Sequence, residues 1–178
     1  MSCDITSGFQ LGCRDNAGGI KKVFILGDTG NDITGITYAG TLGEIDSLTG
    51  TGTFYSFELV KQTSSYTEAI TADDAAGTVF YQSDLVLVFH KIEQEKRNQI
   101  KLLAQSPKLF VVIEDNNGNQ FLLGESNGLT LSAGTAASGV AFGERNGYEI
   151  TLTGFEPSPS NELDGDLSTI TLTGITVA

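Results

Sequence analysis

The sequence contains a single histidine, His90, and this limits the catalytic chemistry that the chain can support. Ser-His-Asp and Cys-His catalytic sites use a histidine as their base, and multi-histidine metal sites need more than one histidine. A single histidine therefore excludes most of these arrangements. His90 follows a predicted strand and precedes a predicted helix, where we expect a surface or capping role. The sequence also lacks a Walker lysine motif and a Gly-x-Gly-x-x-Gly segment opening a helix, so nucleotide chemistry has no support.

The segment Asp115-x-Asn117-x-Asn119 resembles the start of a calcium-binding loop, because alternating oxygen ligands begin such loops. The sixth position of a calcium loop is Gly and the twelfth is Glu, whereas this chain has Gln120 and Ser126 there. We therefore interpret the segment as a hairpin turn.

Paired carboxylates could do acid–base work only where burial or a partner shifts a pKa. Asp73 and Asp74 lie in a polar stretch, and Asp164-Gly165-Asp166 is typical of an acidic turn. The sequence therefore predicts no catalytic residue, no metal ligand and no cofactor site, and we expect a protein that is not an enzyme.

Cys3 and Cys13 have a spacing that matches no zinc, redox or haem motif. In a reducing cytoplasm both would start as free thiols, and a bridge between them remains open.

The charge is strongly negative and unevenly distributed. Ten basic against 22 acidic residues give a formal net charge of −12, which argues against a surface that binds nucleic-acid phosphates tightly. Residues 91–108 hold five basic side chains, between two long acidic segments. This pattern allows complementary contacts between copies, although an ordinary solvated helix face would give the same pattern.

The composition favours strands joined by glycine turns, with 22 Gly, many Thr, only 3 Pro and no Trp. No linker divides residues 1–178, so we expect one structural domain with an N-terminal arm at residues 1–22. Since no apolar run reaches 18 residues and the first 20 residues lack the regions of a signal peptide, we expect neither secretion nor a membrane span.

Apolar and alternating runs predict a mainly β fold. The clearest strand is 79–90, where Val79, Tyr81, Leu85, Leu87 and Phe89 share one face and Ser83 interrupts them. Two apolar runs at 109–114 and 119–124 flank an Asn-Gly turn and predict a hairpin. Further strands are expected at 23–26, 32–38, 54–63, 128–131, 148–155 and 170–177, and residues 132–143 are expected to form a mobile loop.

One helix is expected at residues 91–105, ended by Ser106-Pro107 and packed on a sheet through Ile92, Ile100 and Leu103. Residues 64–76 form a long polar stretch between predicted strands, which we interpret as the projecting tip of a hairpin. A candidate assembly interface combines this loop with the helix: Ser64, Tyr66, Glu68, Asp73, Asp74, Lys96, Arg97 and Lys101.

Residues 77–156 resemble the tail tube (major tail) proteins of tailed bacteriophages. The resemblance rests on patterns of turns and strands: Gly77-Thr78-Val79-Phe80-Tyr81, the helix at 92–105, Glu114-Asp115-Asn116-Asn117-Gly118 with Leu123-Gly124, Asn127-Gly128-Leu129, and residues 146–157 from Asn146-Gly147-Tyr148 to Phe155-Glu156-Pro157. The N-terminal segment with Cys3, Cys13 and Gly18-Gly19-Ile20 is similar to that group too.

This resemblance implies a β-sandwich or barrel of antiparallel strands with one flanking helix. It also implies assembly of the chain with itself into stacked hexameric rings, whose inner strands form one sheet around a channel for DNA ejection. Partners would be further copies and other tail proteins, such as tape measure or neck proteins, and DNA would be passing cargo. The expected location is the tail of a virion made in the cytoplasm of a bacterial host. An acidic lumen would keep DNA mobile by like-charge repulsion.

Other functions remain open from the sequence. A capsid-to-tail connector, ring or collar protein can have the same fold and the same type of oligomeric assembly. A capsid decoration protein or a carbohydrate-binding β-sandwich is a further alternative, although sugar sites usually use exposed aromatic side chains and this chain has no Trp and only 5 Tyr.

Overall fold

The computed structural model describes residues 5, 7–27, 30, 32–40 and 42–178. This part of the chain forms eleven strands and one helix, α1 (Gln94–Gln105). The strands are β1 (Ile20–Gly27), β2 (Asp32–Ala39), β3 (Glu44–Glu58), β4 (Ser65–Asp73), β5 (Thr78–His90), β6 (Leu109–Asp115), β7 (Gln120–Leu123), β8 (Leu129–Ala137), β9 (Gly147–Glu156), β10 (Asn161–Glu162) and β11 (Thr171–Val177). The prediction of a mainly β fold with one helix is confirmed.

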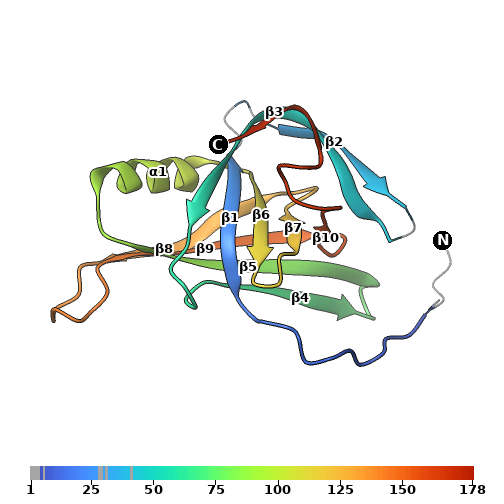
Figure 1. Ribbon diagram of the computed structural model, residues 1–178, viewed down its shortest axis with the longest axis horizontal. Coiled ribbons are helices and arrows are strands. Elements are labelled where there is room, and N and C mark those ends of the chain that lie inside the picture. Colours follow the sequence, from blue (N-terminus) through green and yellow to red (C-terminus); the bar gives the residue numbers. More distant parts are fainter. Residues whose placement is uncertain (1–4, 6, 28–29, 31, 41) are drawn as a thin grey trace.

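The strands pair into one continuous sheet in the order β11-β3-β1-β6-β8-β9-β5-β4, with β2 beside β3 and β7 beside β6 and β10. Pairing is antiparallel except between β11 and β3. Between β6 and β8 the only register pair is Leu109 with Leu129, and here the sheet bends. The strands β8, β9, β5 and β4 consequently run across β1 and β6 (Figure 1). We call these four strands the β8–β4 section. The sandwich or barrel implied by the resemblance stays a prediction.

Two hydrophobic cores lie on opposite faces of β1 and β6. Val23 and Ile25 of β1 face the first core, whereas Phe24 and Leu26 face the second. Successive side chains of a strand point to opposite faces, so a strand buried on both sides needs a continuous apolar run. The first core joins β1 and β6 to the β8–β4 section, and the second lies against β2, β3 and β11.

The predicted core face of residues 79–90 is confirmed for most of its length. Leu85 and Leu87 are buried in the first core, and Phe89 packs against it. Ser83 is also buried, but Val79 at the beginning of the strand is 55% exposed. The strand therefore extends past the core that covers the rest of it.

The helix begins three residues later than the predicted residue 91, at Gln94. Lys91 has a positive φ of 68° and Glu93 is extended, so neither can belong to the helix. Leu103 is buried and Ile100 packs on the first core, whereas Ile92 precedes the helix. The predicted helix is confirmed with a shorter N-terminal end.

Two predicted loops are wrong in most of their length. Of residues 64–76, Ser65–Asp73 form β4, which pairs with β5 at nine positions, so the projecting loop is reduced to a turn at 74–77. Similarly, β8 continues to Ala137, and the loop after it covers residues 138–146. Both errors concern polar or small residues at an edge of the sheet, where a strand forms through its backbone without an apolar face.

The predicted N-terminal arm ends earlier than residue 22, because β1 begins at Ile20. Its described residues before Ile20 are exposed and extend away from the body (Figure 1). Asn116 and Asn117 bind the base of the arm: Asn117 Oδ1 accepts a hydrogen bond from Ala17 N at 2.8 Å, and Asn116 Nδ2 donates to Gly18 O at 2.6 Å. Met1–Asp4, and with them Cys3, lie outside the described residues, so the bridge to the exposed Cys13 stays open.

Candidate assembly surface

The face of the β8–β4 section that points away from the first core carries many threonine and some acidic side chains, together with apolar residues such as Val86 and Val88 of β5. The cross-strand register aligns Thr67 with Asp84, Thr153 and Thr130 on this face. Alternation along the strands adds further members: Thr71, Asp73, Phe80, Thr135, Glu149, Thr151 and Phe155. We call this surface the threonine face.

The carboxylate of Asp84 is fixed near the middle of the threonine face. Thr153 Oγ1 donates a hydrogen bond to Asp84 Oδ1 at 2.7 Å, and Gln82 Nε2 donates to Asp84 Oδ2 at 2.8 Å. Ser132 Oγ lies 2.9 Å from Thr153 Oγ1, which extends the polar network to β8. A chain of hydroxyl and carboxylate groups thus crosses three neighbouring strands.

The four strands of the β8–β4 section contain no Lys or Arg. They contain five acidic residues, and of these Asp73, Asp84 and Glu149 lie on the threonine face. Arg145, in the loop before β9, pairs with Glu149 at 2.7 Å. Apart from Arg145, which reaches Glu149 from the neighbouring loop, the four strands place no cationic side chain on the threonine face.

Both lateral edges of the β8–β4 section lack a strand partner within the described residues. β4 pairs with β5 alone, and β8 pairs with β9 and meets β6 only at Leu129. Unpaired edges expose backbone donors and acceptors that can pair with another chain. The section consequently has one open edge on each side, as needed for head-to-tail pairing of copies.

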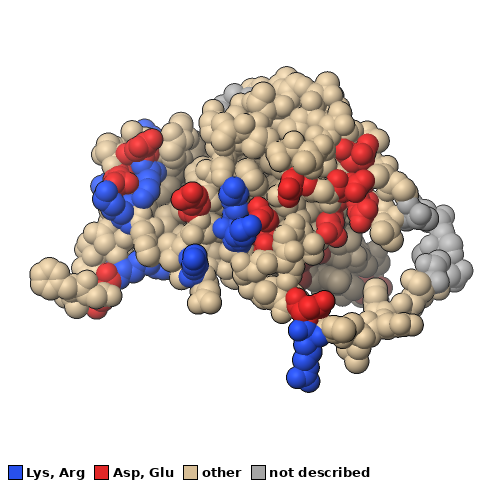
Figure 2. Space-filling view, viewed as in Figure 1, with Lys and Arg blue, Asp and Glu red and all other residues tan. Residues whose placement is uncertain are grey.

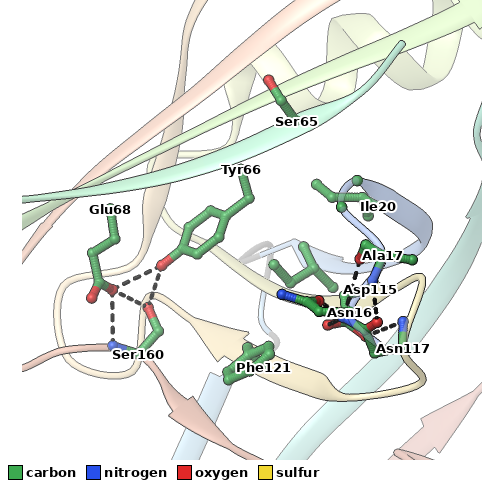
Figure 3. Close-up of a pocket in the computed structure, with 13 residues that line it drawn as sticks. Asn16, Ala17, Ile20, Ser65, Tyr66, Glu68, Asp115, Asn117, Phe121 and Ser160 are labelled. Atoms are coloured by element: carbon green, nitrogen blue, oxygen red, sulfur yellow. Dashed lines mark hydrogen bonds between the residues drawn. The ribbon is translucent and has the colours of Figure 1, made fainter. Parts of the chain in front are cut away.

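Three residues of the predicted interface are engaged within the chain. Ser64 is buried, and its hydroxyl accepts a hydrogen bond from Val88 N at 3.2 Å. Glu68 Oε2 accepts hydrogen bonds from Tyr66 OH at 2.8 Å and from N and Oγ of Ser160 at 3.0 and 2.8 Å (Figure 3). Ser64, Tyr66 and Glu68 therefore anchor β4 to its own chain, because β4 is a strand and not the exposed loop that was predicted.

The Tyr66–Glu68–Ser160 cluster borders an open cavity of about 450 Å³. The arm residues Asn16–Gly19 line one side of this cavity, and Ile20 and Phe121 are among its apolar lining residues (Figure 3). Burial, with the neighbouring Glu68 carboxylate also contributing, raises the pKa of Tyr66 to about 12. A tyrosine that acts as a base or nucleophile needs the opposite shift, so this arrangement favours a neutral phenol that donates a hydrogen bond.

The acidic and basic parts of the predicted interface lie apart. Asp73 Oδ1 accepts hydrogen bonds from Ala75 N and Ala76 N at 2.8 and 3.1 Å and so shapes the β4–β5 turn, where Asp74 is exposed. Lys96 Nζ donates to His90 O at 2.7 Å, while Arg97 and Lys101 of α1 are exposed. Figure 1 places the β4–β5 turn and α1 at opposite ends of the molecule, so one chain does not bring these charges together.

Other candidate sites from the sequence have structural roles. Asp115 Oδ1 accepts hydrogen bonds from Asn117 N and Asn119 N at 2.9 and 2.8 Å, which confirms the hairpin turn between β6 and β7. Asp166 O accepts hydrogen bonds from Thr169 N and Ile170 N in the turn after Gly165. His90 is exposed. Among the described residues no group of His, Cys, Asp and Glu could hold a metal ion, and no helix is long and apolar enough to cross a membrane.

The sequence did not predict two features of this part of the chain: a buried carboxylate and an exposed apolar loop tip. Glu156 is buried, and its carboxylate accepts hydrogen bonds from the backbone N–H groups of Ser126, Asn127 and Gly128 at 2.8–3.1 Å. Val140 and Phe142 are fully exposed at the tip of the loop after β8. The only signal for this tip was two large apolar residues in a glycine-containing loop.

No protein-family model matches the chain, and a search of curated proteins finds no similar sequence.

Proposed function

We propose that this chain is a tail tube subunit of a tailed bacteriophage, which assembles with itself into stacked rings around a channel for DNA ejection. The observation that carries the proposal is the β8–β4 section: four strands without Lys or Arg, with a polar, acidic face and an open edge on each side. The resemblance of residues 77–156 to tail tube proteins implies that the rings are hexameric.

The two open edges provide the contact between neighbours in a ring. β4 of one copy pairs with β8 of the next, so that every edge is satisfied and the sheet becomes continuous around the ring. Such a contact is heterologous, because it joins two different edges. It produces a closed ring when the rotation between neighbouring copies is a whole fraction of a full turn. The threonine face lines the channel in this arrangement.

The composition of the threonine face suits a channel for DNA. Asp73 and Asp84 repel phosphate groups, whereas the carboxylate of Glu149 is paired with Arg145, and the threonine hydroxyls carry no charge that attracts a polyanion. Since Lys and Arg side chains would bind phosphate by releasing counterions, their absence from all four strands allows DNA to slide. Further partners in the virion tail would be tape measure and neck proteins.

Electron microscopy of the purified chain tests this function. A tail tube subunit gives sixfold rings or tubes. Twelvefold rings would instead assign the chain to a capsid-to-tail connector, and a chain that stays monomeric at high concentration would contradict self-assembly altogether.

A further inference from the structure

The loop at residues 138–146 presents a fully exposed apolar tip. Val140 and Phe142 have relative exposures of 100% and 113%, and the loop projects beyond the end of β8 and β9 (Figure 1). Covering a large aromatic side chain that is wholly in water lowers the free energy, so a contact with a partner is favourable. Val140 and Phe142 are therefore candidates for contact with a partner.

Hydrogen bonds within the loop hold the tip in shape. Val140 N donates to Glu144 Oε2 at 2.5 Å, and Glu144 N donates to Ala141 O at 3.0 Å. Arg145 pairs with Glu149 of β9 and connects the base of the loop to the sheet. A preformed tip loses little conformational freedom when it binds.

The opposite end of the same section has an uncovered apolar surface. Tyr66 packs on the first core, and Ile70 of β4 lies on the same face but is 67% exposed. Val79 of β5 is 55% exposed on this face as well. β9 ends at Glu156 opposite Tyr81, and the first core does not reach beyond Ser83, so the β4–β5 hairpin extends past both. We call the surface of Ile70, Ala72 and Val79 the hairpin patch.

The tip and the hairpin patch lie at opposite ends of one strand direction. At one end His90 pairs with Gly147, next to the loop, and at the other end Thr78 pairs with Asp73, next to the β4–β5 turn. A copy shifted along the strands consequently brings the tip of one chain to the hairpin patch of the next. The contact is heterologous and repeats indefinitely, which is the geometry of stacked rings.

The charges at the two ends are complementary. At the loop end Arg145 is paired with Glu149 and follows Glu144, and the neighbouring α1 carries Lys96, Arg97 and Lys101 against Glu95. Asp73 and Asp74 border the hairpin patch, where β4 and β5 hold no Lys or Arg side chain. Figure 2 shows Lys and Arg side chains around α1, with some Asp and Glu side chains among them. Complementary charges at the rim set the register of a contact and exclude the reversed orientation.

We propose that Val140 and Phe142 dock on the hairpin patch of a second copy in the adjacent ring. This contact rests on the proposed function, because it assigns the axial interface between rings of a tail tube. It leaves the lateral edges of β4 and β8 for contacts within a ring.

Replacing the tip tests the docking. The variant Phe142→Ser is expected to form rings that no longer stack, with tube length in electron micrographs reduced to single rings or short stacks. Leu102→Ser is the matched control, because it removes a 58% exposed apolar side chain from α1 and should leave tube length unchanged. Tubes of normal length from Phe142→Ser would overturn the docking while leaving the proposed function intact. If the unaltered chain forms no rings, the proposed function itself fails.

A disulfide test identifies the occupant of the hairpin patch directly. In a background with Cys3→Ser and Cys13→Ser, copies with Ala141→Cys are mixed with copies with Ala72→Cys before assembly and oxidised. We expect a covalent dimer on non-reducing gels, and no dimer when Ala104→Cys, an exposed position of α1, replaces Ala72→Cys.

The natural thiol of Cys13 tests whether the N-terminal arm, instead of the tip of a second copy, occupies the hairpin patch. If Ala72→Cys in a chain that keeps Cys13 crosslinks to Cys13, and Ala141→Cys copies give no dimer, the N-terminal arm covers the hairpin patch and the docking of the tip is wrong.

Discussion

The carboxylate of Glu68 accepts two hydrogen bonds from Ser160, which lies 92 residues further along the chain. The distances are 3.0 Å from the backbone nitrogen and 2.8 Å from Oγ, and Tyr66 OH donates a third hydrogen bond at 2.8 Å. This contact ties the edge strand β4 to the segment before β10. An open edge strand that is held in this way stays available to pair with a neighbour without detaching from its own sheet.

Removal of the Glu68 carboxylate should loosen β4. Glu68→Ala leaves Ser160 N and two hydroxyl groups without their acceptor, and we expect a loss of about 1–3 kcal/mol in the free energy of unfolding. Denaturant unfolding measures the change. Glu68→Gln keeps one acceptor oxygen and should lose less; equal losses in the two variants would contradict a role through hydrogen bonding.

Stability should fall at high pH because of Tyr66. Burial raises its pKa to about 12 in the folded chain, above the ordinary value of 10.0, so folding favours the protonated phenol. The contribution is complete below pH 10 and is lost as the pH rises through 12. Tyr66→Phe removes this part of the pH dependence of unfolding.

Tyr38 needs its own control in that experiment. Burial and the neighbouring Glu125 raise its pKa to about 12 as well, so Tyr38→Phe should remove a separate part of the same decline. If neither variant alters the decline between pH 10 and pH 12, the raised pKa values are wrong.

A positive charge on the threonine face should make the assembled protein bind DNA. Thr153→Lys places a cation beside Asp84, and six or more copies in a ring would multiply its effect. We expect a mobility shift of duplex DNA with Thr153→Lys assemblies that disappears as salt is raised, and none with the unaltered chain.

Thr37→Lys is the matched control, because it adds the same charge at an exposed position of β2, on another part of the sheet. Assemblies of this variant should give no mobility shift, like those of the unaltered chain. Equal binding by the two variants would show that net charge, and not the lining of a channel, decides DNA affinity.

The buried carboxylate of Glu156 should be essential for the turn between β7 and β8. Glu156→Ala leaves the N–H groups of Ser126, Asn127 and Gly128 without an acceptor, and we expect a loss of about 2–3 kcal/mol, measured by denaturant unfolding. Glu156→Gln is the control and should retain part of this stability. A loss below about 0.5 kcal/mol in Glu156→Ala would mean that water replaces the carboxylate.

The elements that the sequence predicted well have strong local signals. The β6–β7 hairpin follows from two apolar runs around Asn117-Gly118, and Gly118 indeed has a positive φ of 94°. Residues 79–90 alternate clearly, and Ser106-Pro107 ends the helix. In each case neighbours in the sequence determine the backbone conformation.

The elements that were missed depend on distant contacts. The strand β4 has a polar sequence, and Ser160 and β5 hold it in place, so nothing between residues 64 and 76 distinguishes it from a loop. Ser64, Tyr66 and Glu68 were expected in an exposed loop for the same reason. The end of β8 contains Ala133, Gly134 and Ala136, which pair with β9 through the backbone and have no apolar pattern.

The position of the β8–β4 section in the assembled particle tests the central proposal most directly. A cryo-electron microscopy map of the purified assembly that resolves the strands should show β4 of each copy paired with β8 of the next, and Asp84 and Thr153 facing the channel. A ring in which the threonine face points outward, or in which basic side chains line the channel, would contradict the proposed tail tube function.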